Sequence, residues 1–150
     1  MAITFNSEDT RFKIDGHCRA VASWIRAAVA EEGFRVGEIA VIFCSDDYLL
    51  SMNRQYLEHD YYTDIITFDY CEGGVLSGDL FISVDTVASN AAEYGAMFHV
   101  ELLRVIIHGV MHLAGYKDKS DEDARKMRER ENHYIEKRSA GMLEGVKYSK

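Results

Sequence analysis

The segment Phe98-His-Val-Glu-Leu-Leu-Arg-Val-Ile-Ile-His-Gly-Val-Met-His-Leu-Ala114 is the stretch around which we expect the chain to fold. At about 3.6 residues per turn, its apolar side chains lie on nearly every side of a helix. A helix of this kind is surrounded by protein rather than by water. Gly115 follows directly and predicts where the helix ends. The sequence therefore predicts a buried helix over Phe98–Ala114, with the other elements packed around it.

Shorter patterns on both sides of this helix predict the remaining elements. Apolar and β-branched runs predict strands at Ile3–Phe5, Phe12–Ile14, Glu38–Cys44, Ile65–Asp69 and Asp79–Val84. Helical spacing and capping residues predict helices at Cys18–Ala30, Asp46–Leu57 and Val87–Tyr94, the third capped by Asp85, and a charged helix from Ser120 or Asp121 to Arg138. The turn-rich loop Glu72–Gly78 separates two neighbouring strands. We expect an α+β fold, with helices packed on one mixed sheet.

The composition is that of a single globular domain. The chain has 150 residues, of which 47% are hydrophobic and 28% are charged, and its net charge is −8. This charge excludes a globally basic nucleic-acid binder but leaves a local basic patch open. The three cysteines are widely spaced and form no CxxC pair, which indicates reduced thiols rather than a thiolate zinc site. With no signal sequence and no apolar run long enough for a membrane span, we expect a soluble, cytoplasmic protein.

Two histidines on the buried helix predict a metal site. His108 and His112 stand four residues apart, so they share one helix face, where two imidazoles can bind one metal ion. A left-handed stop at Gly115 lets the chain turn back and bring Asp118 to the same face. The pattern predicts three metal ligands, His108, His112 and Asp118. The alternative is a pair of core histidines, each with a hydrogen-bond partner.

The predicted ligand set favours zinc in a catalytic site. Imidazole and carboxylate ligands suit zinc, with manganese, iron, cobalt or nickel as other candidates. Three protein ligands leave a fourth position for water, whose pKa zinc lowers toward ~7. The zinc peptidase motif has a Glu directly after its first His, whereas this chain has Gly109 there, which disfavours peptide hydrolysis. A phosphodiester remains a suitable substrate for the activated water.

Positive charge gathers around the same region. Between Arg104 and Arg138 there are nine Lys or Arg and seven Asp or Glu, a net charge of +2, so the rest of the chain carries −10. Taken alone, the segment Ser120–Arg138 is better explained as a solvated helix with ion pairs. Next to a metal site, the same cations can face a phosphate group.

The metal motif carries a family resemblance. His108-Gly-Val-Met-His-Leu-Ala-Gly-Tyr-Lys-Asp118 resembles the hallmark His-Gly-x-Leu-His-Leu-x-Gly-Tyr-Asp-His of the YbeY family, bacterial metal-dependent endoribonucleases of ribosomal RNA maturation. Thr63-Asp-Ile-Ile-Thr-Phe68 and Gly78-Asp-Leu-Phe-Ile-Ser83 resemble the family's Thr-Asp-Val-Leu-Ser-Phe and Gly-Asp-Ile-x-Ile-Ser segments. Asn53 and Tyr56 match its Leu-Asn-x-x-Tyr-Arg helix. These motifs occur in the family's order.

The resemblance implies a function. It implies one endoribonuclease domain over residues 1–150 with one zinc ion per chain. The implied substrate is single-stranded RNA, ribosomal RNA precursor on ribosomal particles, with no DNA and no membrane as partner. The nucleophile is either a metal-activated water or the ribose 2′-hydroxyl.

The chain departs from the family pattern at three positions. Asp118 stands where the family has a third His; a carboxylate binds zinc at a similar distance, but its negative charge weakens the Lewis acidity of the metal. Met111 replaces Leu at nearly constant volume. Leu57 stands where the family has an active-site arginine.

The missing arginine needs a substitute if the activity is unchanged. Arg54 lies three residues before Leu57 and shares its helix face, so we hypothesise that Arg54 is the catalytic cation. The alternative is a solvated arginine on an exposed turn. Lys117 and Lys119, beside the predicted metal ligand, are the next candidates.

Two functions of other classes fit parts of the pattern. In a non-catalytic ribosome assembly factor, the metal would only pin the Asp118 loop to the helix, and protein would fill the fourth position. A non-haem iron oxygenase uses two His and one carboxylate, but its ligands usually come from a β-barrel rather than a helix.

Overall fold

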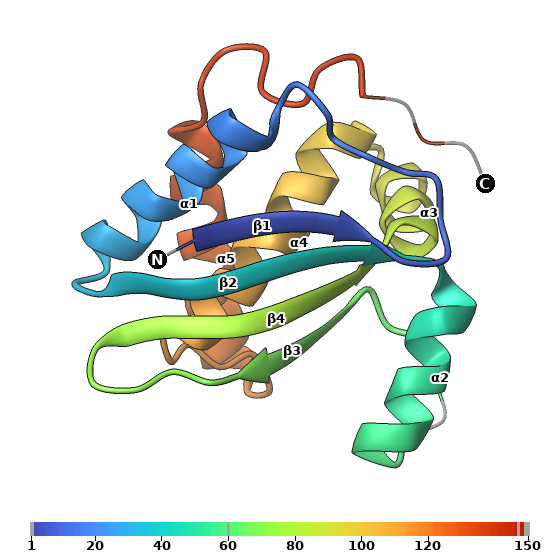
Figure 1. Ribbon diagram of the computed structural model, residues 1–150, viewed down its shortest axis with the longest axis horizontal. Helices are drawn as coiled ribbons and strands as arrows, with labels where there is room; N and C mark the ends of the chain where they lie inside the picture. The colour runs from blue at the N-terminus through green and yellow to red at the C-terminus, as the bar shows by residue number, and fades with distance from the viewer. Residues whose placement is uncertain (1, 60, 147, 149–150) are drawn as a thin grey trace.

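The computed structural model describes residues 2–59, 61–146 and 148 (Figure 1). Among these residues, the strands are β1 (Ala2–Ser7), β2 (Arg35–Cys44), β3 (Ile65–Asp69) and β4 (Val75–Ser83). The helices are α1 (Cys18–Glu31), α2 (Asp46–Leu57), α3 (Val84–Tyr94), α4 (Phe98–Leu113) and α5 (Asp121–Glu136). The predicted α+β class, with one mixed sheet and packed helices, is confirmed.

The sheet has the strand order β1-β2-β4-β3. The first three strands in this order are parallel, and β3 pairs antiparallel with β4 at one edge. Side chains alternate between the two faces, so Leu80 and Ile82 face the main core. Phe81, between them, belongs to a smaller cluster with Leu49 of α2. Helix α2 therefore packs on the face opposite to the other helices, at the end of the sheet (Figure 1).

Helix α4 is buried as predicted: it packs on β3 and β4 and also contacts α1, α3 and α5 (Figure 1). It packs closely on β3 and β4 at Gly109, where a Cβ atom would lie 2.7 Å from Ile65 and 3.0 Å from Leu80. This close approach places the two flanking turns of α4 against the β3 edge of the sheet. No single described helix has the length and hydropathy of a membrane span; α3 and α4 reach them only together, as a pair bent by 118°.

The structure corrects several predicted boundaries. Residues 12–14 form no strand; Phe12 and Ile14 are buried from a loop, and Phe12 packs edge-on against Phe43. Strand β4 begins at Val75 rather than Asp79, because the predicted loop pairs with β2. Gly73 and Gly74 form the predicted turn, whereas Gly78 lies within β4, where pairing with β2 outweighs its turn propensity.

Helix α3 also begins earlier than predicted. Its first residue is Val84, and its N-cap is Ser83 rather than Asp85. The Ser83 hydroxyl accepts a hydrogen bond from the Thr86 N–H at 3.1 Å. The sequence prediction assigns Val84 to the preceding strand because it is β-branched. A β-branched residue does not by itself distinguish the last position of a strand from the first position of a helix.

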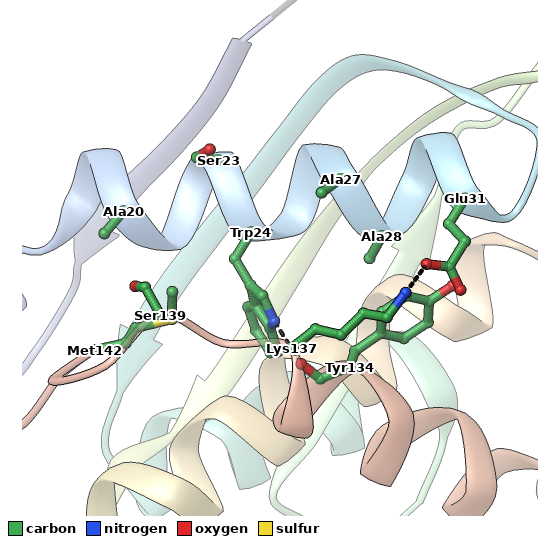
Figure 2. Close-up of a pocket in the computed structure, with 10 residues that line it drawn as sticks. All are labelled: Ala20, Ser23, Trp24, Ala27, Ala28, Glu31, Tyr134, Lys137, Ser139 and Met142. Atoms are coloured by element: carbon green, nitrogen blue, oxygen red, sulfur yellow. Dashed lines mark hydrogen bonds and ion pairs between the residues drawn. The ribbon is translucent and has the colours of Figure 1, made fainter.

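A cavity of about 540 Å³ lies between α1, α5 and the segment that follows α5 (Figure 2). Trp24 points from α1 toward α5, where its indole N–H donates to the Tyr134 carbonyl at 2.7 Å. Lys137 binds Glu31 across the rim at 2.6 Å. None of the described residues lining this cavity belongs to the predicted metal site, so the two features are separate.

Candidate metal centre

The chain reverses direction where α4 ends. Gly115 has φ 103°, a left-handed conformation that side chains other than glycine rarely adopt. The Gly115 N–H donates to the His112 carbonyl at 3.0 Å, and the Tyr116 N–H donates to the Met111 carbonyl at 3.0 Å. These two bonds form the Schellman arrangement, which satisfies carbonyls that a helix end leaves unpaired. The turn carries the following residues back along α4, as the sequence predicts.

The turn brings the three predicted ligands together. The Nε2 atoms of His108 and His112 lie 3.1 and 3.2 Å from the same carboxylate oxygen, Oδ2 of Asp118. The two imidazole rings are 4.6 Å apart and nearly perpendicular, with an interplanar angle of 83°. One ligand atom from each residue lies within 4.8 Å of the others, so the cluster can hold a metal ion.

The spacing of these atoms fits a small divalent ion. Bonds of about 2.0–2.1 Å at tetrahedral angles place neighbouring ligand atoms about 3.3 Å apart. The two nitrogen–oxygen distances of 3.1 and 3.2 Å are close to this value. The donor set, two imidazoles and one carboxylate, is one that zinc and related metals accept. These residues therefore fit the metal that the sequence predicts. That they bind it stays a prediction.

The other ring nitrogen of each histidine is also engaged. Nδ1 of His112 is hydrogen-bonded to the Tyr116 carbonyl at 3.0 Å, which fixes Nδ1 as the protonated nitrogen. Nδ1 of His108 lies 2.7 Å from Oε2 of Glu131, a residue of α5 that is 4% exposed. Partners of this kind hold a ligating imidazole in one tautomer and orientation. Both Nε2 atoms are thus turned toward Asp118.

Electrostatics around His108 depend on Glu131. Burial alone would lower the pKa of His108, but the hydrogen bond and the charge of Glu131 raise it above its ordinary value, with Asp64 and Asp118 contributing. Arg104 holds Glu131 in place through Oε1 at 3.0 Å. The carboxylate of Glu131 therefore bridges Arg104 and His108, which both belong to α4.

Glu131 and Arg104 are the site residues that the sequence analysis missed. A signal for Glu131 was present, because it occupies the buried stripe of α5 that is otherwise apolar (Met127, Tyr134, Ile135). A charged residue inside such a stripe indicates a buried partner. Which partner it meets depends on how α5 packs against α4, and this packing is not encoded in the local pattern.

The three ligands line a cavity of about 520 Å³ that is open to solvent. Its other walls come from α2, from the segment after α2, from β3 and from the loop after α4: Asn53, Leu57, His59, Tyr61, Thr63, Asp64, Ile65, Ile66, Thr67, Asp69 and Lys119. Burial raises the pKa of Asp64, against the opposing charge of His108. Among the described lining residues, Lys119 is the one lysine or arginine.

Of the three cations that the sequence offers for the family's arginine, Lys119 lines the cavity, whereas Arg54 and the exposed Lys117 are not among its described lining residues. Leu57, at the family's arginine position, also lines the cavity, and Arg54 is exposed on α2. The hydrogen bond to Asp47 raises the pKa of the nearby Tyr62, and the charge of Arg54 opposes this shift. A shared helix face does not decide which residue reaches the cavity. The catalytic role of Arg54 stays a prediction, and Lys119 has the position that such a role requires.

Most other cations of the charged region are bound to carboxylates. Ion pairs join Lys126 to Glu122, Arg130 to Glu32 and Lys137 to Glu31, at 3.5, 3.2 and 2.6 Å. Helix α5 therefore matches the interpretation of a solvated helix with ion pairs. The patch that can face a phosphate is smaller than the sequence count indicates and lies at the loop after α4.

Together, the fold and the site define an α+β protein in which a buried helix and the loop after it bring together three side chains that could hold a metal ion, an arrangement that metal-dependent hydrolases use. Comparisons with known proteins identify the family. The family model described as Endoribonuclease YbeY matches residues 2–139. The chain belongs to the YbeY endoribonuclease family, and the resemblance found in the sequence is confirmed.

Individual relatives agree with this assignment. The chain is 54% identical to Endoribonuclease YbeY of Bacteroides thetaiotaomicron over 132 residues, which cover 88% of this chain and 96% of the relative. It is 47% identical to Endoribonuclease YbeY of Flavobacterium johnsoniae over 133 residues, 89% of this chain and 94% of the relative. The solution structure of TM1509 from Thermotoga maritima superposes with a TM-score of 0.64 at 29% identity, covering 90% of this chain and 87% of that one.

The contact between Glu131 and His108 yields a prediction for metal affinity. Glu131→Gln keeps the size of the side chain but removes the charge that orients and polarises the imidazole, so zinc affinity is expected to fall about tenfold or more. Titration against a chromophoric chelator measures this change. The control is Glu122→Gln, on an exposed position of the same helix that pairs with Lys126. Equal zinc affinity in the two variants would contradict the role given to Glu131.

Proposed function

We propose that this chain is a zinc-dependent endoribonuclease that cuts unpaired RNA, with ribosomal RNA precursor on ribosomal particles as its substrate. The observation that carries the proposal is the convergence of both Nε2 atoms on Asp118 Oδ2 inside an open cavity. Membership of an endoribonuclease family supports the RNA substrate. The place of action that we expect is the cytoplasm.

The ligand count supports catalysis rather than a structural role. A structural zinc site is closed by four protein ligands, whereas a catalytic one has three and an open position. The described residues provide a group of three, and the side chain of Asp118 is 39% exposed. Zinc held there supplies a Lewis acid and activates water for attack at neutral pH. The position after His108 is Gly109, so no adjacent Glu serves as the base that a zinc peptidase uses.

The residues of the chain provide the remaining requirements. Glu131 and the Tyr116 carbonyl hold the two imidazoles, so the ligand atoms are oriented before the substrate arrives. Lys119, on the cavity wall, neutralises charge on the phosphate that is cut. The ribose 2′-hydroxyl and an activated water both remain possible nucleophiles at this phosphate.

The cavity favours an unpaired strand. Its volume of about 520 Å³ is in the range of small-molecule sites, which suits one nucleotide. In an RNA duplex, the bases are stacked inside and cannot enter such a cavity singly. Because the protein is acidic overall, it binds RNA through few cations, and binding is expected to weaken moderately with salt.

Cleavage assays with purified protein test the proposal. Zinc-loaded protein is expected to cut a single-stranded RNA, to leave the same sequence nearly intact in a duplex, and to lose activity when a chelator removes the metal. Activity is expected to return when zinc is added back, with one zinc ion per chain by elemental analysis. Duplex cleavage at the single-strand rate would contradict the substrate assignment.

Two outcomes would replace the proposal with an alternative. Zinc-loaded protein that cuts no RNA, free or on ribosomal particles, would favour a non-catalytic assembly factor. Metal-dependent turnover that requires oxygen and a keto acid would favour an oxygenase, which shares the same ligand types.

Because Lys119 is among the described lining residues of the cavity and Arg54 is not, substitutions at the two positions are expected to affect RNA cleavage differently. A hydrogen bond to a charged group contributes about 1.5–3 kcal/mol, so Lys119→Ala is expected to lower kcat/KM at least about tenfold. Arg54→Ala, the matched control, is expected to change kcat/KM less than about twofold. Zinc content and melting temperature are measured for both variants. The opposite order of effects would return the catalytic cation to Arg54.

A further inference from the structure

Two aromatic side chains form a stacked pair at the rim of the metal cavity. His59 and Tyr61, in the segment after α2, both line the cavity. Their ring centroids are 5.1 Å apart and the planes differ by 21°. A hydrogen bond of 3.0 Å joins the Tyr61 hydroxyl to Nδ1 of His59. The metal chemistry proposed above uses neither ring.

The pair lies in a region of unusual exposure. Seven large hydrophobic residues are exposed among the described residues, and five of them fall between positions 56 and 70 (Tyr56, Leu57, Tyr61, Tyr62, Tyr70). Tyr61 is 56% exposed, so much of its ring is available to a ligand. Clustered exposed aromatic surface is uncommon in a folded protein and marks sites of interaction. Of the five, Leu57 and Tyr61 line the metal cavity.

A buried asparagine holds this segment in place. Asn53 is 1% exposed; its Nδ2 donates to the Tyr61 carbonyl at 2.8 Å, and its own carbonyl accepts from the His59 N–H at 3.1 Å. Between α2 and the pair, Glu58 adopts a left-handed conformation with φ 56°. The Asn53 side chain thus holds the backbone at Tyr61, and the Asn53 backbone carbonyl holds the backbone at His59. A ligand that stacks on the pair meets a surface that is already ordered.

The two sides of the cavity differ in chemistry. The side formed by the end of α2 and the segment after it is aromatic and apolar at Leu57, His59 and Tyr61, whereas the loop after α4 contributes Lys119 next to Asp118. A nucleotide has the same two ends, a flat base and a charged phosphate. If Lys119 and a metal ion held by the three ligands were to bind the phosphate, the base of a neighbouring nucleotide would face the aromatic side.

We propose that His59 and Tyr61 form a stacking site for one unpaired nucleobase next to the phosphate that is cut, an inference that rests on the proposed RNA-cleaving function. Stacking accepts every base, because each has a π face, so the site selects unpaired nucleotides rather than a sequence. It also supplies contact area at the position where Leu57 replaces the family's arginine.

The experiment combines variants of the protein with variants of the RNA. The substrate is a short unpaired RNA and a series in which each nucleotide in turn lacks its base. With zinc-loaded protein, the RNA concentration that gives half the maximal single-turnover rate reports affinity. One abasic position is expected to weaken binding about tenfold, the effect of losing one base–aromatic stack.

Tyr61→Ala is expected to weaken binding of the complete RNA by about the same factor and to make that abasic position neutral. Tyr61→Phe is expected to keep most of the affinity, because the ring remains while the bond to His59 is lost. The maximal cleavage rate and the zinc content are expected to stay within about twofold in both variants, because Tyr61 is not among the predicted ligands.

Tyr62→Ala is the matched control. Tyr62 is also 56% exposed, but its hydroxyl donates to Asp47 and it is not among the described residues of the cavity. Equal losses in Tyr61→Ala and Tyr62→Ala would overturn the proposal, and so would abasic and Tyr61→Ala effects that simply add. If the parent protein cuts no RNA, the proposed function fails, and fluorescence anisotropy with the same RNAs then decides the stacking site by itself.

Discussion

The backbone turn at Gly115 is the constraint on which the metal centre depends. Two histidines four residues apart provide two ligand atoms, and a straight helix offers no third within reach. The paired hydrogen bonds from Gly115 and Tyr116 end α4 and reverse the chain, so that Asp118 meets both imidazoles. The same turn directs the Tyr116 carbonyl to Nδ1 of His112. One backbone motif thus places a ligand and orients another.

The rest of the fold supports this turn. The Tyr116 hydroxyl donates to Glu32 at the end of α1 at 2.7 Å, and Glu32 also binds Arg130 of α5. Helix α5 places Glu131 within hydrogen-bonding distance of the imidazole of His108. The sheet packs closely against α4 at Gly109. Because α1, α5 and the sheet all contact the helix or its turn, the metal centre is a product of the tertiary structure rather than of the motif alone.

The sequence predicted those features that depend on local pattern. The α+β class, the buried helix and the meeting of Asp118 with the two histidines followed from periodicity and from one glycine. The predicted strand at Phe12–Ile14 is wrong because a buried loop and a strand share the same apolar pattern. The role of Glu131 and the position of Lys119 are not predicted from the sequence, because they depend on how helices and loops pack. The prediction that Arg54 replaces the family's arginine rests on the helix face that it shares with Leu57. Which residues of that face line the cavity is determined by the orientation of α2.

The most direct test of the account is the crystal structure of the zinc-loaded protein, with diffraction recorded at the zinc absorption edge. The account predicts an anomalous peak about 2.0–2.2 Å from Nε2 of His108, Nε2 of His112 and a carboxylate oxygen of Asp118, with no protein atom in the fourth position. A zinc ion bound elsewhere, an Asp118 turned away from the ion, or a fourth protein ligand that closes the site would contradict it.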